Sequence, residues 1–179
     1  MVDDETIRKQ CIGCRGVENE KDILLYRGKL IKVVLSTDNQ CWLGRCVIVP
    51  DEHISPVDLY ASRHDVYQEI GAAIAMMTRC YRHLFGMAYP NICQLGNLTK
   101  DLNGCITTED RYHHVHFHYI PRYDKPVQYA GETFVDKQWG RGLNVDRESG
   151  LLDFKEVSPR TIQAIVTQVR EYIDNDLPL

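Results

Sequence analysis

The distribution of apolar and polar residues divides the chain into short strands and two long helices. Apolar runs that predict strands lie at residues 23–26, 30–35, 46–49, 91–95 and 114–120. The first two runs flank Arg27, Gly28 and Lys29, a segment typical of a tight turn, and therefore predict a hairpin.

The stretch from residue 62 to residue 84 has the three- and four-residue spacing of an amphipathic helix. Its recurring apolar positions are Val66, Ile70, Ala73, Met77, Tyr81 and Leu84. Ser62, with Asp65 three positions later, predicts a capping box at the start, and Gly86 stands where the helix is expected to end.

A terminal helix is expected over residues 158–174. Ser158 is its predicted N-cap, and Pro159 suits the first helical position because its missing N–H has no partner there. The apolar stripe of this helix is formed by Ile162, Ile165, Val166, Val169 and Ile173.

The order of these elements favours a single α+β domain over residues 1–179. No internal repeat and no Gly/Ser-rich linker divides the sequence. Residues 98–111 are polar and irregular, and predict an inserted loop, while residues 124–157 form an extension ahead of the terminal helix.

Composition and charge narrow the classes of function. The net charge is −4, from 21 basic and 25 acidic residues, and no basic cluster argues for nucleic acid as a partner. No apolar run approaches the roughly 18 residues of a membrane span. The N-terminal sequence is too polar for a secretory signal, so we expect a cytoplasmic protein.

Cysteines are frequent, and two of them form a Cys-x-x-Cys motif at Cys11 and Cys14. Their number, seven, is odd and no export signal is present, which favours reduced thiols or metal ligands over disulfides. The motif occurs both in redox sites and in zinc half-sites. A thioredoxin-type motif requires a preceding strand, which the polar N-terminus does not supply.

The segment His113–Arg122, with the sequence HHVHFHYIPR, carries the most specific chemistry. Alternate residues of a strand share a face, so His114, His116 and His118 are expected on one side. Three neighbouring imidazoles suit a metal ion or an anion such as phosphate, and the alternative is a solvated strand face.

This pattern of three histidines, followed by two apolar residues and Pro121-Arg122, closely resembles the signature of the histidine triad (HIT) superfamily. Residues 44–53 (GRCVIVPDEH) resemble the strand that precedes it in the family, and residues 95–97 (LGN) resemble a segment of one branch. Residues 131–140 (GETFVDKQWG) are similar to the tail of bacterial-type HIT hydrolases. The resemblance implies an α+β fold with an antiparallel sheet, a long central helix and a C-terminal helix.

The resemblance also implies a function. Family members are nucleotide hydrolases and transferases that act at an α-phosphate through a nucleotidyl-histidine. His116 is then the nucleophile, His118 contacts the phosphate or the leaving group, and Asn97 donates to the same phosphate. Dinucleoside polyphosphates, such as diadenosine polyphosphates, or nucleoside phosphoramidates are the expected substrates.

Two features leave alternatives open. Asn103 is an alternative to Asn97 as the donor to the phosphate. Many family members carry Gly-Gln-Ser or Gly-Gln-Thr just before the triad, and residues 107–112 stand there in this sequence. A catalytically silent nucleotide-binding module is therefore one alternative. A zinc-dependent hydrolase with an open metal site is another.

In members with an N-terminal Cys-x-x-Cys, the resemblance implies a structural zinc ion on four ligands, which here are Cys11, Cys14, His53 and His114. It also implies that a cleft near the early strands holds the base and the sugar of the nucleotide. The residues expected there are Leu35, Asp38, Asn39 and Trp42. Family members usually pair through the long helix and an edge strand, so a homodimer is expected.

Overall fold

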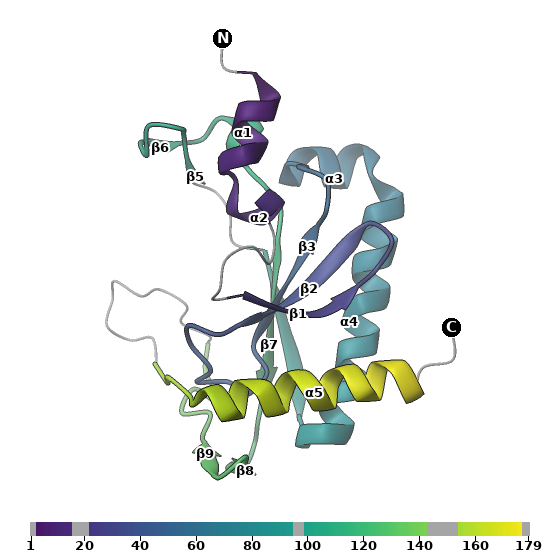
Figure 1. The fold of residues 1–179 in the computed structure, drawn as a ribbon, viewed down its shortest axis with the longest axis vertical. Helices are drawn as coiled ribbons and strands as arrows, with labels where there is room; N and C mark the ends of the chain where they lie inside the picture. Colours follow the sequence, from purple (N-terminus) through teal and green to yellow (C-terminus); the bar gives the residue numbers. More distant parts are fainter. Residues whose placement is uncertain (1–2, 16–21, 95–98, 143–153, 177–179) are drawn as a thin grey trace.

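The computed structural model describes residues 3–15, 22–94, 99–142 and 154–176. Its centre is a five-stranded antiparallel sheet (Figure 1). In spatial order the strands are β1 (Asp22–Arg27), β2 (Ile31–Ser36), β3 (Cys46–Pro50), β7 (Phe117–Arg122) and β4 (Tyr89–Cys93). The predicted hairpin is thus formed by β1 and β2.

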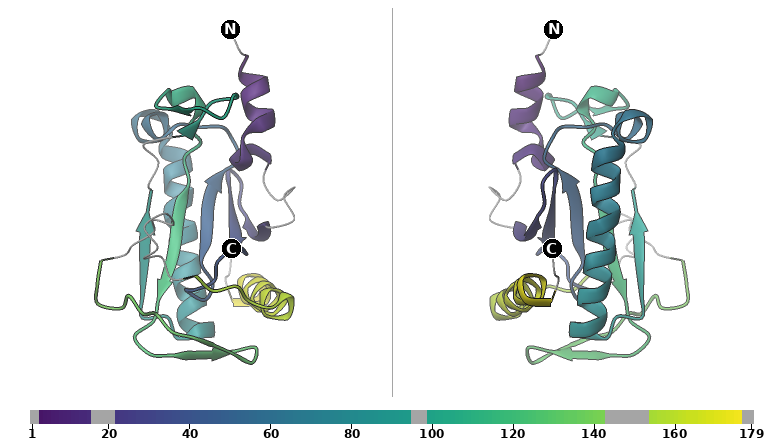
Figure 2. Two further views of the ribbon diagram at one scale, coloured as in Figure 1. Left: turned by 90° about the vertical axis from the view of Figure 1, so that its left-hand side faces the viewer. Right: turned by 90° about the vertical axis from the view of Figure 1, so that its right-hand side faces the viewer.

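The two long helices are α4 (His64–Phe85) and α5 (Pro159–Asp176). Helix α4 packs on β2 and β3, and α5 packs on α4 and β1. Figure 2 shows α5 end-on while α4 runs along the sheet, so the two helices cross steeply. The short helices α1 (Asp4–Gln10) and α2 (Ile12–Arg15) lie at the opposite end of the sheet from α5 (Figure 1).

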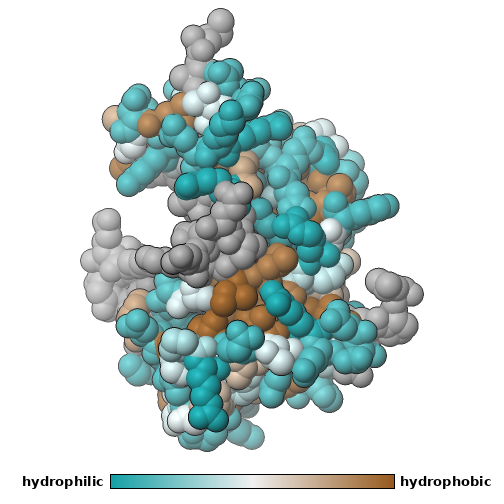
Figure 3. Space-filling view, viewed as in Figure 1, coloured by the Kyte–Doolittle hydropathy of each residue, from teal (hydrophilic) through white to brown (hydrophobic). Residues whose placement is uncertain are grey.

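One hydrophobic core joins the sheet to both long helices. From the sheet it contains Val33, Leu35, Ile48 and Tyr119, which share the face toward α4 by strand alternation. The predicted helical stripes supply the other side: all of their members are buried except Leu84 and Ile173, which are partly buried. The α+β class is therefore confirmed. Polar residues dominate the surface view in Figure 3 apart from an apolar patch over the centre of the sheet.

The predicted capping box at Ser62 and Asp65 is wrong. Ser62 ends a separate short helix, α3 (Pro56–Ser62), and its hydroxyl donates to the carbonyl of Asp58 at 3.0 Å. The cap lies one helix earlier, where the N–H of Asp58 donates to Ser55 Oγ at 3.1 Å. The sequence places a proline directly after this serine, which favours a helix start there.

The histidine strand begins later than predicted, at Phe117 rather than His114. Its pairing with β3 starts at Phe117, opposite Ile48. Ahead of that point the chain leaves the sheet, and the N–H of Val115 donates to the carbonyl of Ile54 at 2.8 Å. The alternation nevertheless continues through this extended segment, because Val115 and Phe117 are both buried.

The remaining predicted segments form small additions to the sheet. Within the predicted inserted loop, β5 (Thr99–Lys100) and β6 (Ile106–Thr107) pair as a hairpin, and a 3₁₀ turn follows at Asp110–Tyr112. The extension before α5 contains a second hairpin, β8 (Val127–Tyr129) and β9 (Glu132–Phe134). Among the described helices, none has the length and apolar character that a membrane span requires.

A buried ion pair fastens this extension to the sheet. Arg122 Nε donates to Asp136 Oδ2 at 2.5 Å, and both side chains are almost fully enclosed. Trp42 Nε1 donates to the same carboxylate at 3.2 Å. One carboxylate thereby links β7, the loop before β3 and the segment after β9.

Candidate functional site

A cavity of about 670 Å³ lies on the face of the sheet opposite the main core, close to the N-terminal helices. Alternate side chains of β2 and β3 form its floor, and α1, α2 and the β5–β6 hairpin contribute walls. The three alternate histidines, His114, His116 and His118, all line it. The shared face expected from the sequence therefore exists, although the first two histidines precede the strand.

His116 and His118 lie side by side in this cavity, with ring centroids 5.0 Å apart and planes at 84°. The Nδ1 atom of His116 is 3.1 Å from the carbonyl oxygen of His114. A carbonyl only accepts, so Nδ1 carries a proton, and in the neutral ring Nε2 keeps a free lone pair. Burial, together with the charges of His116 and Arg45, lowers the pKa of His118 to about 4, and that ring is therefore neutral at pH 7.

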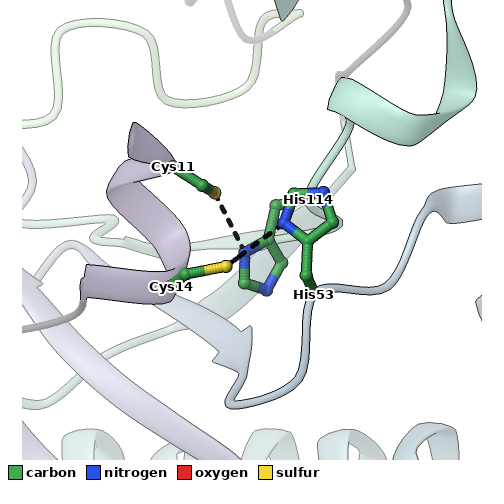
Figure 4. A group of neighbouring side chains, drawn as sticks. All are labelled: Cys11, Cys14, His53 and His114. Atoms are coloured by element: carbon green, nitrogen blue, oxygen red, sulfur yellow. Dashed lines mark hydrogen bonds between the residues drawn. The ribbon is translucent and has the colours of Figure 1, made fainter. Parts of the chain in front are cut away.

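Beside the cavity, which Cys11 and His114 help to line, the side chains of Cys11, Cys14, His53 and His114 converge (Figure 4). Their ligand atoms all lie within 4.8 Å of one another. Nδ1 of His114 is 3.3 Å from Cys11 Sγ and 3.5 Å from Cys14 Sγ, and Nδ1 of His53 is 3.2 Å from Cys14 Sγ. A tetrahedral zinc ion places sulfur and nitrogen ligands about 3.5 Å apart, so both the donor set and the spacing fit that metal.

In both His53 and His114, the ring nitrogen that faces away from the thiols contacts a backbone carbonyl. Nε2 of His53 is 3.0 Å from the carbonyl oxygen of Arg111, and Nε2 of His114 is 3.0 Å from that of Pro50. A carbonyl only accepts, so each Nε2–H donates to its carbonyl, and Nδ1 of each ring faces the thiols. Such outer hydrogen bonds are typical of histidines that bind a metal.

The two thiols differ in acidity. Burial alone raises the pKa of Cys11, but hydrogen bonds from His114 and His53 outweigh it and bring the pKa to about 5. Burial and the neighbouring Cys11 thiolate raise the pKa of Cys14 to about 12. Two adjacent thiolates thus require a cation between them, which is what a bound zinc ion provides.

Gly13 explains why the motif closes so tightly over the histidine. A Cβ atom at this position would lie 2.4 Å from His114 Nδ1, so a larger residue would displace the ring. The carbonyl of Gly13 accepts a hydrogen bond from the buried Lys32 Nζ at 2.7 Å. The motif is therefore fastened to the sheet on one side and packed against His114 on the other.

The expected ligand-binding residue Leu35 lies elsewhere. It is fully buried in the core, on the face of β2 that packs against α4. Its strand neighbours Val34 and Ser36, together with Lys32, face the cavity instead. Lys32, Val34 and Ser36 share a side by strand alternation, but the period alone does not show which side of a strand meets the cavity.

The other three expected ligand-binding residues lie in the turn between β2 and β3 and do not line the cavity. Asp38 is exposed, and Trp42 is buried against Ile120. Asn39 is fully buried, where its Oδ1 accepts from the backbone N–H of Lys155 at 3.1 Å. The structure therefore assigns structural contacts to Asn39 and Trp42.

Asn97 and the segment at residues 95–97 fall outside the described residues. The competing Asn103 lies in the β5–β6 hairpin, where its N–H donates to Asp101 Oδ1 at 2.9 Å, and it is not among the residues that line the cavity. Arg45 lies directly before β3, and its charge acts on His118, an effect that the sequence did not predict because the two residues are 73 positions apart.

Several solved structures that share this fold are named as histidine triad proteins. A hypothetical histidine triad nucleotide-binding protein from Sulfolobus tokodaii matches with a TM-score of 0.61 at 15% identity, over 92% of this chain and 93% of that one. A histidine triad protein from Bradyrhizobium japonicum gives 0.56 at 16% identity, over 85% and 90% of the two chains. A zinc-bound histidine triad family protein from Mycobacterium smegmatis gives 0.51 at 19% identity, over 92% and 98%.

The HIT-like fold expected from the sequence is thus confirmed. At these identities the likeness concerns the fold. No family model matches the sequence, and no curated protein matches it either.

Proposed function

We propose that this chain is a histidine triad hydrolase or nucleotidyl transferase that acts at the α-phosphate of a nucleotide, with His116 as the nucleophile. The observation that supports this most directly is the contact between His116 Nδ1 and the His114 carbonyl. In the neutral ring this contact leaves Nε2 as the unprotonated nitrogen, inside a cavity of about 670 Å³, a volume in the range of small-molecule sites. The half-buried His118, whose ring is neutral at pH 7, lies beside it.

The reaction then has two steps. Nε2 of His116 attacks the α-phosphorus while the bond to the leaving group breaks, and the leaving group departs with the electron pair. Water next attacks the phosphorus of the nucleotidyl-histidine, the phosphorus–nitrogen bond breaks, and Nε2 recovers its lone pair. The water oxygen ends on the nucleoside monophosphate, and its released proton balances the charge of the leaving group.

For the ligand we propose a dinucleoside polyphosphate or a nucleoside phosphoramidate. Val34, Ser36, Val47 and Val49 form a largely apolar floor with one hydroxyl, which suits a base and a sugar. The role of Asn97 as a phosphate donor and the pairing of two chains through α4 and an edge strand stay proposals from the family resemblance.

We further propose that Cys11, Cys14, His53 and His114 hold a structural zinc ion. Four protein ligands complete a tetrahedron, so this metal would stabilise the fold and would not bind substrate. The zinc-bound neighbour supports this assignment. His114 would then join the zinc site to the segment that carries His116, which places the nucleophile.

The proposed activity is tested by AMP release from diadenosine tetraphosphate and from adenosine phosphoramidate. We expect turnover by the wild type and its loss in His116→Ala. His64→Ala removes an exposed imidazole at the start of α4 and serves as the matched control, with turnover retained. AMP binding without release by the wild type would reject the enzyme in favour of the silent binding module.

The zinc site is tested by metal analysis of protein purified without added metal, with about one zinc per chain expected. Cys11→Ser should lose the ion, whereas Cys105→Ser, at an exposed cysteine outside the cluster, should keep it. A wild type that contains no zinc and takes none up on refolding would reject the site.

A further inference from the structure

Lys32 places a buried ammonium group at the floor of the cavity. Its side chain is 4% exposed, and its Nζ donates to the carbonyl of Gly13 at 2.7 Å, a bond between two residues that both line the cavity. Asp51 Oδ1 is 3.9 Å from Nζ, beyond hydrogen-bond distance, and both oxygens of that carboxylate accept from Arg27. An ammonium group has three donors, and burying a charge whose donors are unused is costly. The other donors are therefore expected to contact a ligand.

The floor of the cavity runs from Lys32 to the triad. Lys32 lies opposite Val49 in the pairing of β2 with β3, and the next row across the sheet consists of Val34, Val47 and His118. All five side chains line the cavity. Adjacent strands are about 4.8 Å apart, so two strand spacings, about 10 Å, separate β2 from the histidine strand β7. A ligand whose phosphate lies at the histidines can therefore extend across the valines to Lys32.

The surroundings of Nζ favour the base of a nucleotide over its phosphate chain as the partner. Val34 and Val49, which flank Lys32 on the floor, have no polar side-chain atoms. A phosphate chain carries several charged oxygens, and each would lose water without gaining a donor from the valines. A flat base has apolar faces and a few polar atoms at its edge, so it fits against the valines with that edge toward Nζ.

We propose that Lys32 is a specificity-determining residue, which selects guanine over adenine by donating hydrogen bonds from Nζ to O6 and N7 of the base. An ammonium group only donates. Guanine presents two neighbouring acceptors, O6 and N7, on one edge, and lysine is a common partner of that pair. Adenine also has N7, but it carries an amino donor in place of O6, which would face the ammonium group donor to donor.

The position of the ammonium group is held before a ligand binds. Its acceptor, the Gly13 carbonyl, belongs to the backbone of the Cys-x-x-Cys motif, and Gly13 packs closely on the ring of His114. A donor that is already in place contributes to selectivity without the cost of ordering a flexible side chain. This inference rests on the proposed function, because it takes the ligand to be a nucleotide, and it adds the identity of the base.

Calorimetric titration with nucleoside monophosphates measures this selectivity without turnover. We expect the wild type to bind GMP at least about fivefold more tightly than AMP. IMP keeps O6 and N7 of guanine but lacks the 2-amino group, so its affinity should lie within about threefold of that of GMP.

Variants of Lys32 then assign the selectivity to this residue. Lys32→Met removes the donors while it keeps the length of the side chain, and its affinity for GMP should fall to that for AMP. Lys32→Arg retains donors and should still prefer GMP. Lys29→Met makes the same charge change at an exposed residue between β1 and β2, outside the cavity, and should leave both affinities unchanged.

Equal affinities of the wild type for GMP and AMP, or an affinity for IMP equal to that for AMP, would overturn the proposal, and neither result depends on how the variants fold. A Lys32→Met variant that still preferred GMP would overturn it as well. If this variant bound GMP and AMP more weakly by the same factor, Lys32 would contact a part that both nucleotides share, and its role in selecting the base would be rejected. No release of GMP from guanosine phosphoramidate would count against the proposed activity, whereas the order of affinities would still decide the role of Lys32.

Discussion

Replacing Gly13 by alanine is a direct test of how the Cys-x-x-Cys motif closes over His114. Gly13 lies within the short helix α2, where alanine is normally better than glycine by roughly 0.5–1 kcal/mol. In this protein, however, the new Cβ would lie 2.4 Å from Nδ1 of His114 and 2.9 Å from its Cγ. Ordinary contacts begin at 3.4 Å, so the ring must retreat by about 1 Å.

That displacement exceeds the tolerance of a zinc–nitrogen bond, which is about 0.2 Å around its ideal length. Disturbing the support of a ligand typically lowers metal affinity by about 10- to 100-fold, equivalent to about 1.4–2.7 kcal/mol. The better helix propensity of alanine offsets part of this loss, so the zinc-loaded Gly13→Ala variant should be less stable than the wild type by about 1–2 kcal/mol. In the metal-free chain the ring is free to turn away, so the loss should disappear.

The assay is urea unfolding with zinc and with a chelator, together with competition against a zinc indicator. Gly71→Ala is the matched control, because Gly71 also lies within a helix, α4, and a Cβ there meets no atom within 4 Å. We expect it to be slightly stabilising both with zinc and with chelator. If Gly13→Ala bound zinc within about threefold of the wild type, the proposed contact between this glycine and the zinc site would be refuted.

Two further outcomes are expected. Asp136→Ala leaves the guanidinium of Arg122 buried without its partner, so the free energy of unfolding should fall by about 3–5 kcal/mol, measured as a lower urea midpoint. The double variant Asp136→Leu with Arg122→Met removes both charges and should recover part of that stability. If the single and the double variant lost equal stability, the unpaired charge would not be the main cause. The pKa of His118 in the folded chain, about 4, lies below its ordinary value of 6.5, so on acidification the unfolded chain takes up the proton first. Between pH 7 and pH 5 the wild type should therefore lose about 2 kcal/mol more stability than His118→Gln. If both proteins lost the same stability over this range, the pKa of His118 would not be lowered in the folded chain.

Local patterns were sufficient for much of the fold and for part of the site. The two-residue alternation predicted that His114, His116 and His118 share a side, and all three line the cavity. The stripes of both long helices likewise coincide with buried positions. These predictions succeeded because each depends on the period of one element, which neighbouring residues determine.

Boundaries and directions were decided by contacts between elements. Helix α3 starts at a serine–proline pair, a local signal that the longer apolar period obscured, and the non-helical backbone of Arg63 separates it from α4. Leu35 faces the core because α4 packs on that side of β2. A periodic pattern defines two faces of a strand, but only the packing partner determines which of them is buried.

The site itself combines both kinds of information. The family resemblance named the four proposed zinc ligands, yet Cys11 and His114 are separated by 103 residues, and their 3.3 Å approach depends on how the N-terminal helices pack against the sheet. The close packing of Gly13 on the His114 ring and the hydrogen bond from Lys32 to the Gly13 carbonyl have no counterpart in any local pattern. The sequence determines which residue types are available and how each segment presents them, whereas distances between remote segments follow from the burial of the whole core, to which every element contributes.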